Sequence, residues 1–269
     1  MQLDKIFIYP IKSGAAVSIP DGEVEARGLR HDRRWMLVDA DHRFITGRQY
    51  AQITQVSPML VDDGIELRAQ GMSPLRVERP VDEAETVMAQ VWKDSVRALV
   101  ADQEANRWLS DFLGLPLKLV YQGGDSHRPI SGTGSQPGDE VSFADGYPLL
   151  ALGTASLGDL NSRLETAVPV EQFRPNLVIR TDSPFVEDCW VSTDINGVRF
   201  DNAKLCTRCI FTTVDPRTGI KAGNAEPFKT LRSYRFDRSL KGVVFGVNWI
   251  ARSGGKITVG DPVTLSGNS

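Results

Sequence analysis

The chain has 269 residues, of which 41% are hydrophobic and 24% are charged, and it carries a formal net charge of −3. This composition is typical of a globular protein with one large or two modest domains, and the charge argues against non-specific binding of nucleic acid. Three cysteines are too few for a disulfide framework, and no apolar run approaches the roughly 20 residues of a membrane span. Because the first residues do not resemble a signal peptide, we expect a cytoplasmic protein without a membrane segment.

Short strands predominate in the pattern of apolar residues. Alternating or β-branched runs predict strands at residues 3–8, 35–39, 117–121, 177–179, 198–200 and 243–250, with further short strands within 59–77 and 87–100. A hairpin is expected at residues 15–27, turned at residues 20–22.

Two segments have helical periodicity. Asp102 is expected to cap a helix whose apolar residues recur every three or four positions up to Leu113, and Gly114 ends it. Thr154 is expected to cap a second helix, and residues 122–138, rich in Gly, Ser and Pro, are the best candidate for a linker. The protein is therefore predicted to be mainly β with a few helices (α+β) and to contain β-barrels.

Several short stretches suit the binding of an anion. Lys12 and Ser13 lie in a loop that combines a cation with backbone amides, although a plain surface turn explains the same residues. A proline between Arg174 and Asn176 fixes the backbone and would present a guanidinium beside an amide. Thr154 would open a helix whose N-terminus can bind an anion, and capping alone explains this residue equally well.

Residues 205–219 contain two of the three cysteines, Cys206 and Cys209, with Arg208 between them. The apolar and β-branched run 209–214 predicts a strand that begins at the second cysteine and ends at an Asp-Pro turn. A zinc site would lack a second pair of ligands, a redox disulfide usually opens a helix, and two inert buried thiols are also compatible. Against inert thiols, Arg208 would favour a thiolate, which is a good ligand for a soft or high-valent metal.

The cysteine stretch, together with four others in the same order, resembles the MOSC superfamily and most closely its amidoxime-reducing branch. The four other stretches are residues 9–13, 28–35, 173–176 and 260–263, so the resemblance covers almost the whole chain. It implies an N-terminal MOSC-type β-barrel domain followed by a MOSC β-barrel domain, with a molybdenum cofactor (molybdopterin) between them. The expected boundary divides the chain into residues 1–121 and 122–269.

The resemblance also implies roles for individual residues. Cys209 would be the catalytic residue and the molybdenum ligand. Binding of the cofactor would involve cationic and polar side chains from several stretches: Lys12, Ser13, Arg33, Arg174, Asn176, Thr207 and Arg208, with Thr154 added from the helix N-terminus argument. Three residues near the expected mouth of the site are second-rank candidates: Thr46, Arg48 and Gln49.

By resemblance, the activity is reduction of small N-hydroxylated or N-oxide compounds by two-electron removal of oxygen. The alternative is a carrier of molybdenum cofactor or sulfur, related to the C-terminal domains of cofactor sulfurases. No cysteine follows Cys209 and no G-x-G-x-x-G fingerprint follows a strand, so we expect electrons from a separate ferredoxin, flavin reductase or haem carrier. No nucleic acid, membrane or pyridoxal phosphate is expected to take part.

Overall fold

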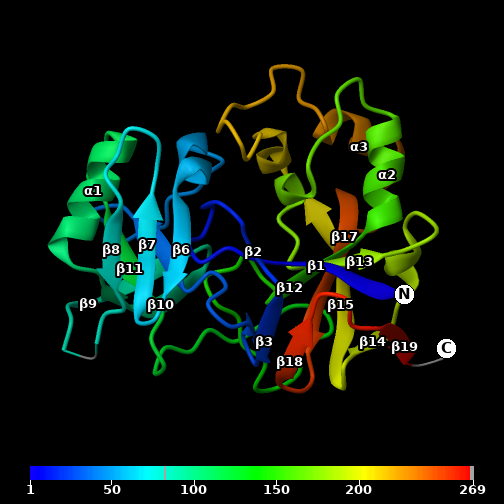
Figure 1. Ribbon diagram of the computed structural model, residues 1–269, viewed down its shortest axis with the longest axis horizontal. Helices are drawn as coiled ribbons and strands as arrows, with labels where there is room; N and C mark the ends of the chain where they lie inside the picture. The colour runs from blue at the N-terminus through cyan, green and yellow to red at the C-terminus, as the bar shows by residue number, and fades with distance from the viewer. Residues whose placement is uncertain (82, 267–269) are drawn as a thin grey trace.

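The computed structural model describes residues 1–81 and 83–266 and shows two halves that lie side by side (Figure 1). Strands predominate, as the sequence predicts. Short 3-10 turns occur between some of the strands. The α-helices of the described residues are α1 (Gln103–Leu113), α2 (Thr154–Ser162) and α3 (Phe228–Tyr234). The first of these helices belongs to one half and the other two belong to the second half.

The first half is built from two small antiparallel sheets and helix α1. One sheet has the order β5 (Trp35–Val38), β11 (Lys118–Tyr121), β10 (Asp94–Val100) and β9 (Thr86–Val91). The other contains β6 (Ser57–Val61), β7 (Gly64–Arg68) and β8 (Leu75–Glu78), and the turn η1 (Ala51–Gln55) precedes it. Their shared core includes Ile65, Leu119 and Trp108 of α1.

Helix α1 has the predicted caps. The Asp102 carboxylate accepts a hydrogen bond from the backbone N–H of Ala105 at 2.7 Å, and Gly114 has left-handed backbone angles (φ 69°) at the other end. Both are local solutions to unpaired backbone groups at helix ends, which is why the sequence alone could predict them.

The second half is a nine-stranded sheet that curls into a half-barrel. Eight strands follow one another in the order β19 (Val263–Ser266), β14 (Ser192–Ile195), β15 (Val198–Arg208), β17 (Gly242–Ala251), β12 (Leu149–Gly153), β13 (Leu177–Arg180), β1 (Gln2–Ile8) and β2 (Val17–Ile19), while β16 (Phe236–Asp237) pairs with β17. A separate small sheet joins β18 (Gly255–Thr258), β3 (Asp21–Glu25) and β4 (Gly28–Leu29). Three 3-10 turns lie between strands of the nine-stranded sheet: η2 (Val170–Phe173), η3 (Val186–Cys189) and η4 (Ile210–Thr213).

Strand β1 is buried on both faces of this sheet. Ile6 and Ile8 enter the core cluster that contains Trp249, whereas Phe7 enters the cluster on the other face, which includes Leu160 of α2 and Leu231 of α3. A strand covered on both faces has to be apolar at nearly every position, which is the pattern that residues 6–8 show, whereas Asp4 is only half-buried and Lys5 is exposed.

The first strand therefore belongs to the second half of the molecule. β1 (Gln2–Ile8) pairs with β13 from Gln2, opposite Arg180, to Ile6, opposite Leu177, more than 170 residues away in sequence. The chain then crosses into the first half, where Ile11 forms an isolated bridge with Trp35. Since the opening residues are shared with the second sheet, the division of the chain at residues 121 and 122 stays a prediction.

Two local predictions are wrong. Residues 15–27 do not form a hairpin, because β2 pairs with β1 and β3 pairs with β18 and β4. The run 209–214 is not a strand: β15 ends at Arg208 and the 3-10 turn η4 follows. The hydroxyls of Thr212 and Thr213 donate to the carbonyls three residues earlier, at 2.9 and 2.7 Å, and such local bonds compete with a β-ladder.

The predicted linker, residues 122–138, contains no strand or helix of the structure but packs firmly against both halves. Gln122 and Arg128 are buried. The Arg128 guanidinium pairs with Asp94 at 2.9 Å and donates to the carbonyl of Ser142 at 2.9 Å. This segment is therefore an ordered strap, and the buried Arg128 is one of several arginines that hold it.

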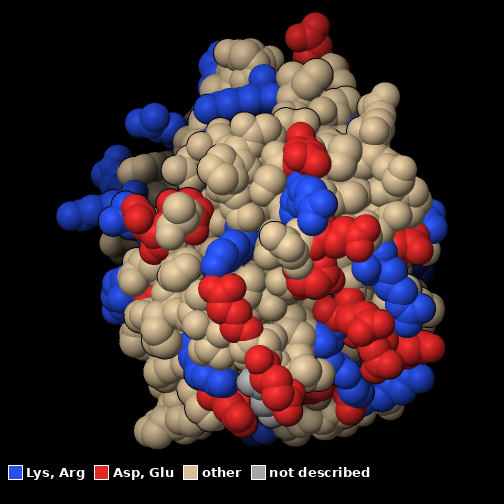
Figure 2. All heavy atoms as spheres, turned by 90° about the vertical axis from the view of Figure 1, so that its left-hand side faces the viewer, with Lys and Arg blue, Asp and Glu red and all other residues tan. Residues whose placement is uncertain are grey.

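None of the helices within residues 1–81 and 83–266 is long and apolar enough to cross a membrane. On the side of the molecule where α1 lies, basic and acidic side chains are interspersed (Figure 2).

Trp249 is the largest fully buried side chain, and its ring lies 5.3 Å from that of Phe200 and 6.0 Å from that of Trp190. We expect Trp249→Ala to lower the free energy of unfolding by about 3–5 kcal/mol, because it removes this contact area and leaves a cavity in the larger core. Urea denaturation measures the change. Leu265→Ala, at a 54% exposed position of β19, is the control and should shift it by less than about 0.5 kcal/mol.

Candidate active site

A cleft of about 310 Å³ lies between the two halves and is lined by residues from both. Eight of the nine predicted site residues line it: Lys12, Ser13, Arg33, Arg174, Asn176, Thr207, Arg208 and Cys209. Of the second-rank candidates, Thr46 and Arg48 line the cleft, while Gln49 only accepts a hydrogen bond from the Thr46 hydroxyl at 3.2 Å.

Thr154 is not among the residues that line the cleft. It is the first residue of α2 rather than its cap, which is Gly153, and its hydroxyl oxygen accepts a hydrogen bond from the backbone N–H of Thr181. Ser156, two residues further, is fully buried and donates to Glu187 at 2.6 Å. Side chains at the start of α2 therefore hold this helix against Thr181 and Glu187. The prediction that Thr154 caps the helix is wrong.

The crossing segment between the halves brings Lys12 and Ser13 into the cleft. The backbone N–H of Lys12 donates to the carbonyl of Trp35 at 2.8 Å, which fixes the segment against β5. Its ammonium group donates to the carbonyl of Phe143 at 2.7 Å and to Asp145 at 2.5 Å. Burial lowers the pKa of Lys12, and the charge of Asp145 opposes this effect.

Arg33 and Arg174 lie against the ring of the buried Tyr9, with guanidinium carbons 4.3 and 4.1 Å from its centroid. Arg33 donates to Asp32 at 2.6 Å and to the side-chain oxygen of Asn176 at 2.8 Å. Burial lowers the pKa of Arg174 to about 10, so this side chain is still a cation at neutral pH. The two guanidiniums thus form one wall of the cleft.

Arg208, the last residue of β15, is held by two contacts within the second half of the molecule. It donates to the sulfur of Cys206 at 3.0 Å and to the carbonyl of Phe173 at 2.5 Å. Cys206 therefore has a partner inside the protein. Cys209, by contrast, is an exposed free thiol immediately after the end of β15.

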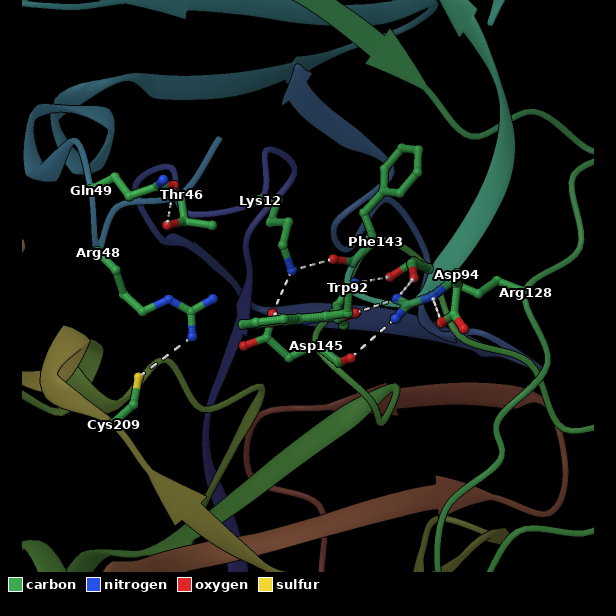
Figure 3. A network of polar contacts seen from close by, with 12 residues as sticks. Lys12, Thr46, Arg48, Gln49, Trp92, Asp94, Arg128, Phe143, Asp145 and Cys209 are labelled. Carbon is green, nitrogen blue, oxygen red and sulfur yellow. Dashed lines mark hydrogen bonds and ion pairs between the residues drawn. The ribbon is translucent and has the colours of Figure 1, made fainter. Parts of the chain in front are cut away.

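The thiol of Cys209 faces Arg48, whose guanidinium nitrogen lies 3.8 Å from the sulfur (Figure 3). Arg48 comes from the first half of the molecule and Cys209 from the second, so the contact spans the cleft.

Asp145 forms the rim beside Lys12. Its side chain is 62% exposed. The surrounding protein partly desolvates the carboxylate, which by itself would raise the pKa of Asp145. The charge and hydrogen bond of Lys12 outweigh this effect and lower the pKa, with a further contribution from Arg48. The indole N–H of Trp92 also donates to this carboxylate at 3.3 Å (Figure 3).

The cleft is strongly cationic. Asp145 is the one carboxylate among its lining residues, against six cationic side chains: Lys12, Arg33, Arg48, Arg174, Lys204 and Arg208. Such a concentration of positive charge raises the local concentration of anions and stabilises a bound one.

Comparison with known proteins shows to which family the chain is similar. Residues 1–116 match the MOSC N-terminal beta barrel domain and residues 138–264 match the MOSC domain. Mitochondrial amidoxime-reducing component 1 of Mus musculus is 34% identical over 280 residues, which cover 98% of this chain and 82% of that protein. The chain belongs to the amidoxime-reducing component family of MOSC proteins.

Two further members of the family show the same degree of similarity. Mitochondrial amidoxime-reducing component 1 of Homo sapiens is 34% identical over 286 residues, covering 98% of this chain and 82% of that protein. Mitochondrial amidoxime reducing component 2 of Bos taurus is 34% identical over 276 residues, covering 97% and 82%. The resemblance inferred from the five motifs is thereby confirmed.

The MOSC family implies a molybdenum cofactor, and the cleft residues fit its anionic pterin phosphate. Two buried guanidinium nitrogens of residues that line the cleft, Nη2 of Arg174 and Nε of Arg208, have no hydrogen-bond partner among the residues that the structure describes. Burying a donor without a partner costs free energy, and the oxygens of a bound phosphate would satisfy such donors. No group of three or more His, Cys, Asp or Glu suited to a metal occurs among the described residues, so a protein-only metal cage does not compete with this interpretation.

The sequence did not single out several residues of the site. Asp145, Gln172, Lys204 and Asn248 were not proposed for the site although all line the cleft. Gln172 donates to the carbonyl of Thr212 at 2.8 Å and so fixes the turn after Cys209. An acidic residue in a turn carries no sequence signal of its own, because its role depends on Lys12, 133 residues away.

Asp145 gives a prediction about pH. Its pKa in the folded protein is below the value of about 3.9 expected in an unfolded chain, so its contribution to stability is present above about pH 4 and is lost as the pH falls through the folded pKa. We expect the difference in urea midpoint between the native protein and Asp145→Asn to be largest near pH 7 and to shrink below about pH 4. A difference that does not change with pH would contradict the ion pair as its source.

Proposed function

We propose that the chain is a molybdenum-cofactor-dependent reductase of N-hydroxylated compounds. The observation that carries this proposal is the cationic cleft with two unpaired buried guanidinium nitrogens and an exposed thiol at its mouth. The names of the relatives supply the reaction, because they are amidoxime-reducing components. The same names place those proteins in mitochondria; for this chain the cytoplasm stays a prediction made from its sequence.

The proposed cofactor-binding residues divide by chemistry. Lys12, Arg174 and Arg208 would donate charge-assisted hydrogen bonds to the phosphate, each contributing roughly 1.5–3 kcal/mol. Ser13 from the crossing segment and Thr207 from the end of β15 would add neutral hydrogen bonds. Arg33 and Asn176, which are already bonded to each other at 2.8 Å, would bind the same group and also keep Arg174 in place, since Arg33 donates to its carbonyl at 3.2 Å.

Cys209 is the proposed metal ligand. Its sulfur is exposed and lies beside Arg48, whereas the sulfur of Cys206 already accepts a hydrogen bond from Arg208. When bound, the cofactor supplies the two-electron chemistry by which an N-hydroxyl group, with two electrons and two protons, becomes N–H and water. The protein holds the thiolate at the mouth of the cleft, where a small substrate can reach it.

The electrons would come from a separate protein. The three cysteines of the chain cannot hold an iron–sulfur cluster of the four-cysteine type, and the sequence has no dinucleotide-binding fingerprint. We propose a ferredoxin, a flavin reductase or a haem carrier as the donor, and a small N-hydroxylated compound as the acceptor.

Variants of the two neighbouring cysteines test the proposal. We expect Cys209→Ser to abolish reduction of benzamidoxime by protein loaded with molybdenum cofactor, with reduced viologen as donor, because the metal loses its thiolate ligand. Cys206→Ser is the matched control and should keep a substantial part of the activity. Equal losses in both folded variants would refute the assignment, and a loaded native protein that reduces no N-hydroxylated compound would point to the carrier function instead.

The anion-binding wall gives a second prediction. Arg174→Ala should purify with less molybdenum than the native protein, by up to about tenfold when cofactor is limiting, since loss of one charge-assisted hydrogen bond of about 1.5 kcal/mol corresponds to roughly tenfold in affinity. Metal analysis of both proteins after expression with the same limiting supply of cofactor measures this. Arg180→Ala, at the end of β13 with a side chain that is 63% exposed, should retain the native content. Full occupancy in Arg174→Ala would rule out the wall as the phosphate site.

A further inference from the structure

A second hollow adjoins the cleft and is connected with it. It has a volume of about 880 Å³ and shares four lining residues with the cleft: Asp145, Gly146, Tyr147 and Lys204. Three aromatic side chains line it, Phe44, Trp92 and Tyr147. The roles proposed above for the cleft residues leave this hollow without a function.

Trp92 occupies a position that is unfavourable for a large side chain. It is the first residue of the two-residue turn between β9 and β10, and its φ is 55°. Glycine or asparagine is the low-strain choice in such a turn, and a bulky residue with positive φ costs free energy. The turn nevertheless presents an indole that is 46% exposed, which points to a function for the ring rather than to a role in folding.

Three contacts hold this indole beside the thiol. Its N–H donates to Asp145 at 3.3 Å, the Phe44 ring lies 5.0 Å away, and the Arg48 guanidinium carbon lies 4.4 Å from its centroid. Because Arg48 also reaches to 3.8 Å from the sulfur of Cys209, a single guanidinium separates the indole from the proposed reaction centre (Figure 3).

The hollow also has an excess of positive charge. Its two carboxylates are occupied, since Asp94 pairs with Arg128 at 2.9 Å and Asp145 pairs with Lys12 at 2.5 Å. Neither Lys93 nor Lys204 forms an ion pair with any of the described residues. An anionic group on a ligand would find both ammonium groups available.

We propose that this hollow is the substrate subsite and that it selects N-hydroxylated compounds carrying both a flat aromatic ring and an anionic group. The ring stacks on the exposed part of Trp92, the anion lies near Lys93 and Lys204, and the N-hydroxyl group extends past Arg48 toward Cys209. The proposal rests on the proposed reductase function for its reacting group, whereas the binding of the ring and the anion depends only on the hollow.

Three substrates with the same reacting group test the subsite: acetamidoxime, benzamidoxime and 4-carboxybenzamidoxime. With loaded protein and reduced viologen, Trp92→Gly should raise the KM for the two aromatic substrates about five- to tenfold, as loss of an aromatic contact predicts, while kcat stays within about twofold. The KM for acetamidoxime should not change. Trp92→Phe should restore most of the affinity, and Met88→Ala, an exposed neighbour on β9, should behave like the native protein.

The charge is tested separately. Lys93→Gln should raise the KM for 4-carboxybenzamidoxime alone, by about threefold or more, as expected for loss of a partly exposed ion pair. Lys229→Gln, an exposed lysine of α3, is the control. Equal changes for all three substrates, or no change for any of them, would overturn the subsite.

A binding measurement separates this proposal from the reductase function. Calorimetry with 4-carboxybenzamide, which has no N-hydroxyl group, should show binding to the native protein and at least fivefold weaker binding to Trp92→Gly. If no preparation reduces any amidoxime but this difference is found, the reductase proposal fails and the subsite stands. If the native protein and Trp92→Gly bind the compound equally, the subsite is refuted.

Discussion

One buried ion pair holds the walls of the cleft together. The Asp32 carboxylate is fully buried, and its pairing with Arg33 at 2.6 Å compensates a charge that burial would otherwise make unfavourable. Burial raises the pKa of Asp32 and the charge of Arg33 opposes this effect. The carboxylate also accepts the backbone N–H of Tyr9 at 2.8 Å, while Arg33 reaches Asn176. Loss of either partner would leave an uncompensated charge in the interior and would release three separate segments at once.

The crossing of the chain between the halves gives the cleft its composition. β1 lies in the large sheet, Tyr9 packs beside Phe173 in one core, and Ile11 packs with Trp35 in the other. Residues that follow immediately, including Lys12, must therefore lie at the junction of the two cores. The site depends on both halves, because the cationic walls come from both and no single sheet carries them.

Several residues at this junction have strained backbone angles. Ser13, Arg33 and Arg174 have positive φ angles of 68°, 48° and 57°, and all three line the cleft. Trp92, beside it, has φ 55°. Such conformations persist only where the surrounding structure enforces them, and they occur most often where a ligand has to be met by particular side chains.

The sequence by itself determined the local features of this protein. Alternating apolar residues predicted the strands, Asp102 and Gly114 predicted the ends of α1, and five ordered motifs identified the family and eight residues of the cleft, because these signals depend on neighbours in the chain. Only the tertiary structure decided that β1 pairs with β13, that β15 ends before Cys209, that Thr154 lies outside the cleft, and that Asp145 and Trp92 stand at its rim. Those outcomes depend on partners far away in sequence, and the hydrogen bonds and charges that fix them exist only once the two halves have come together.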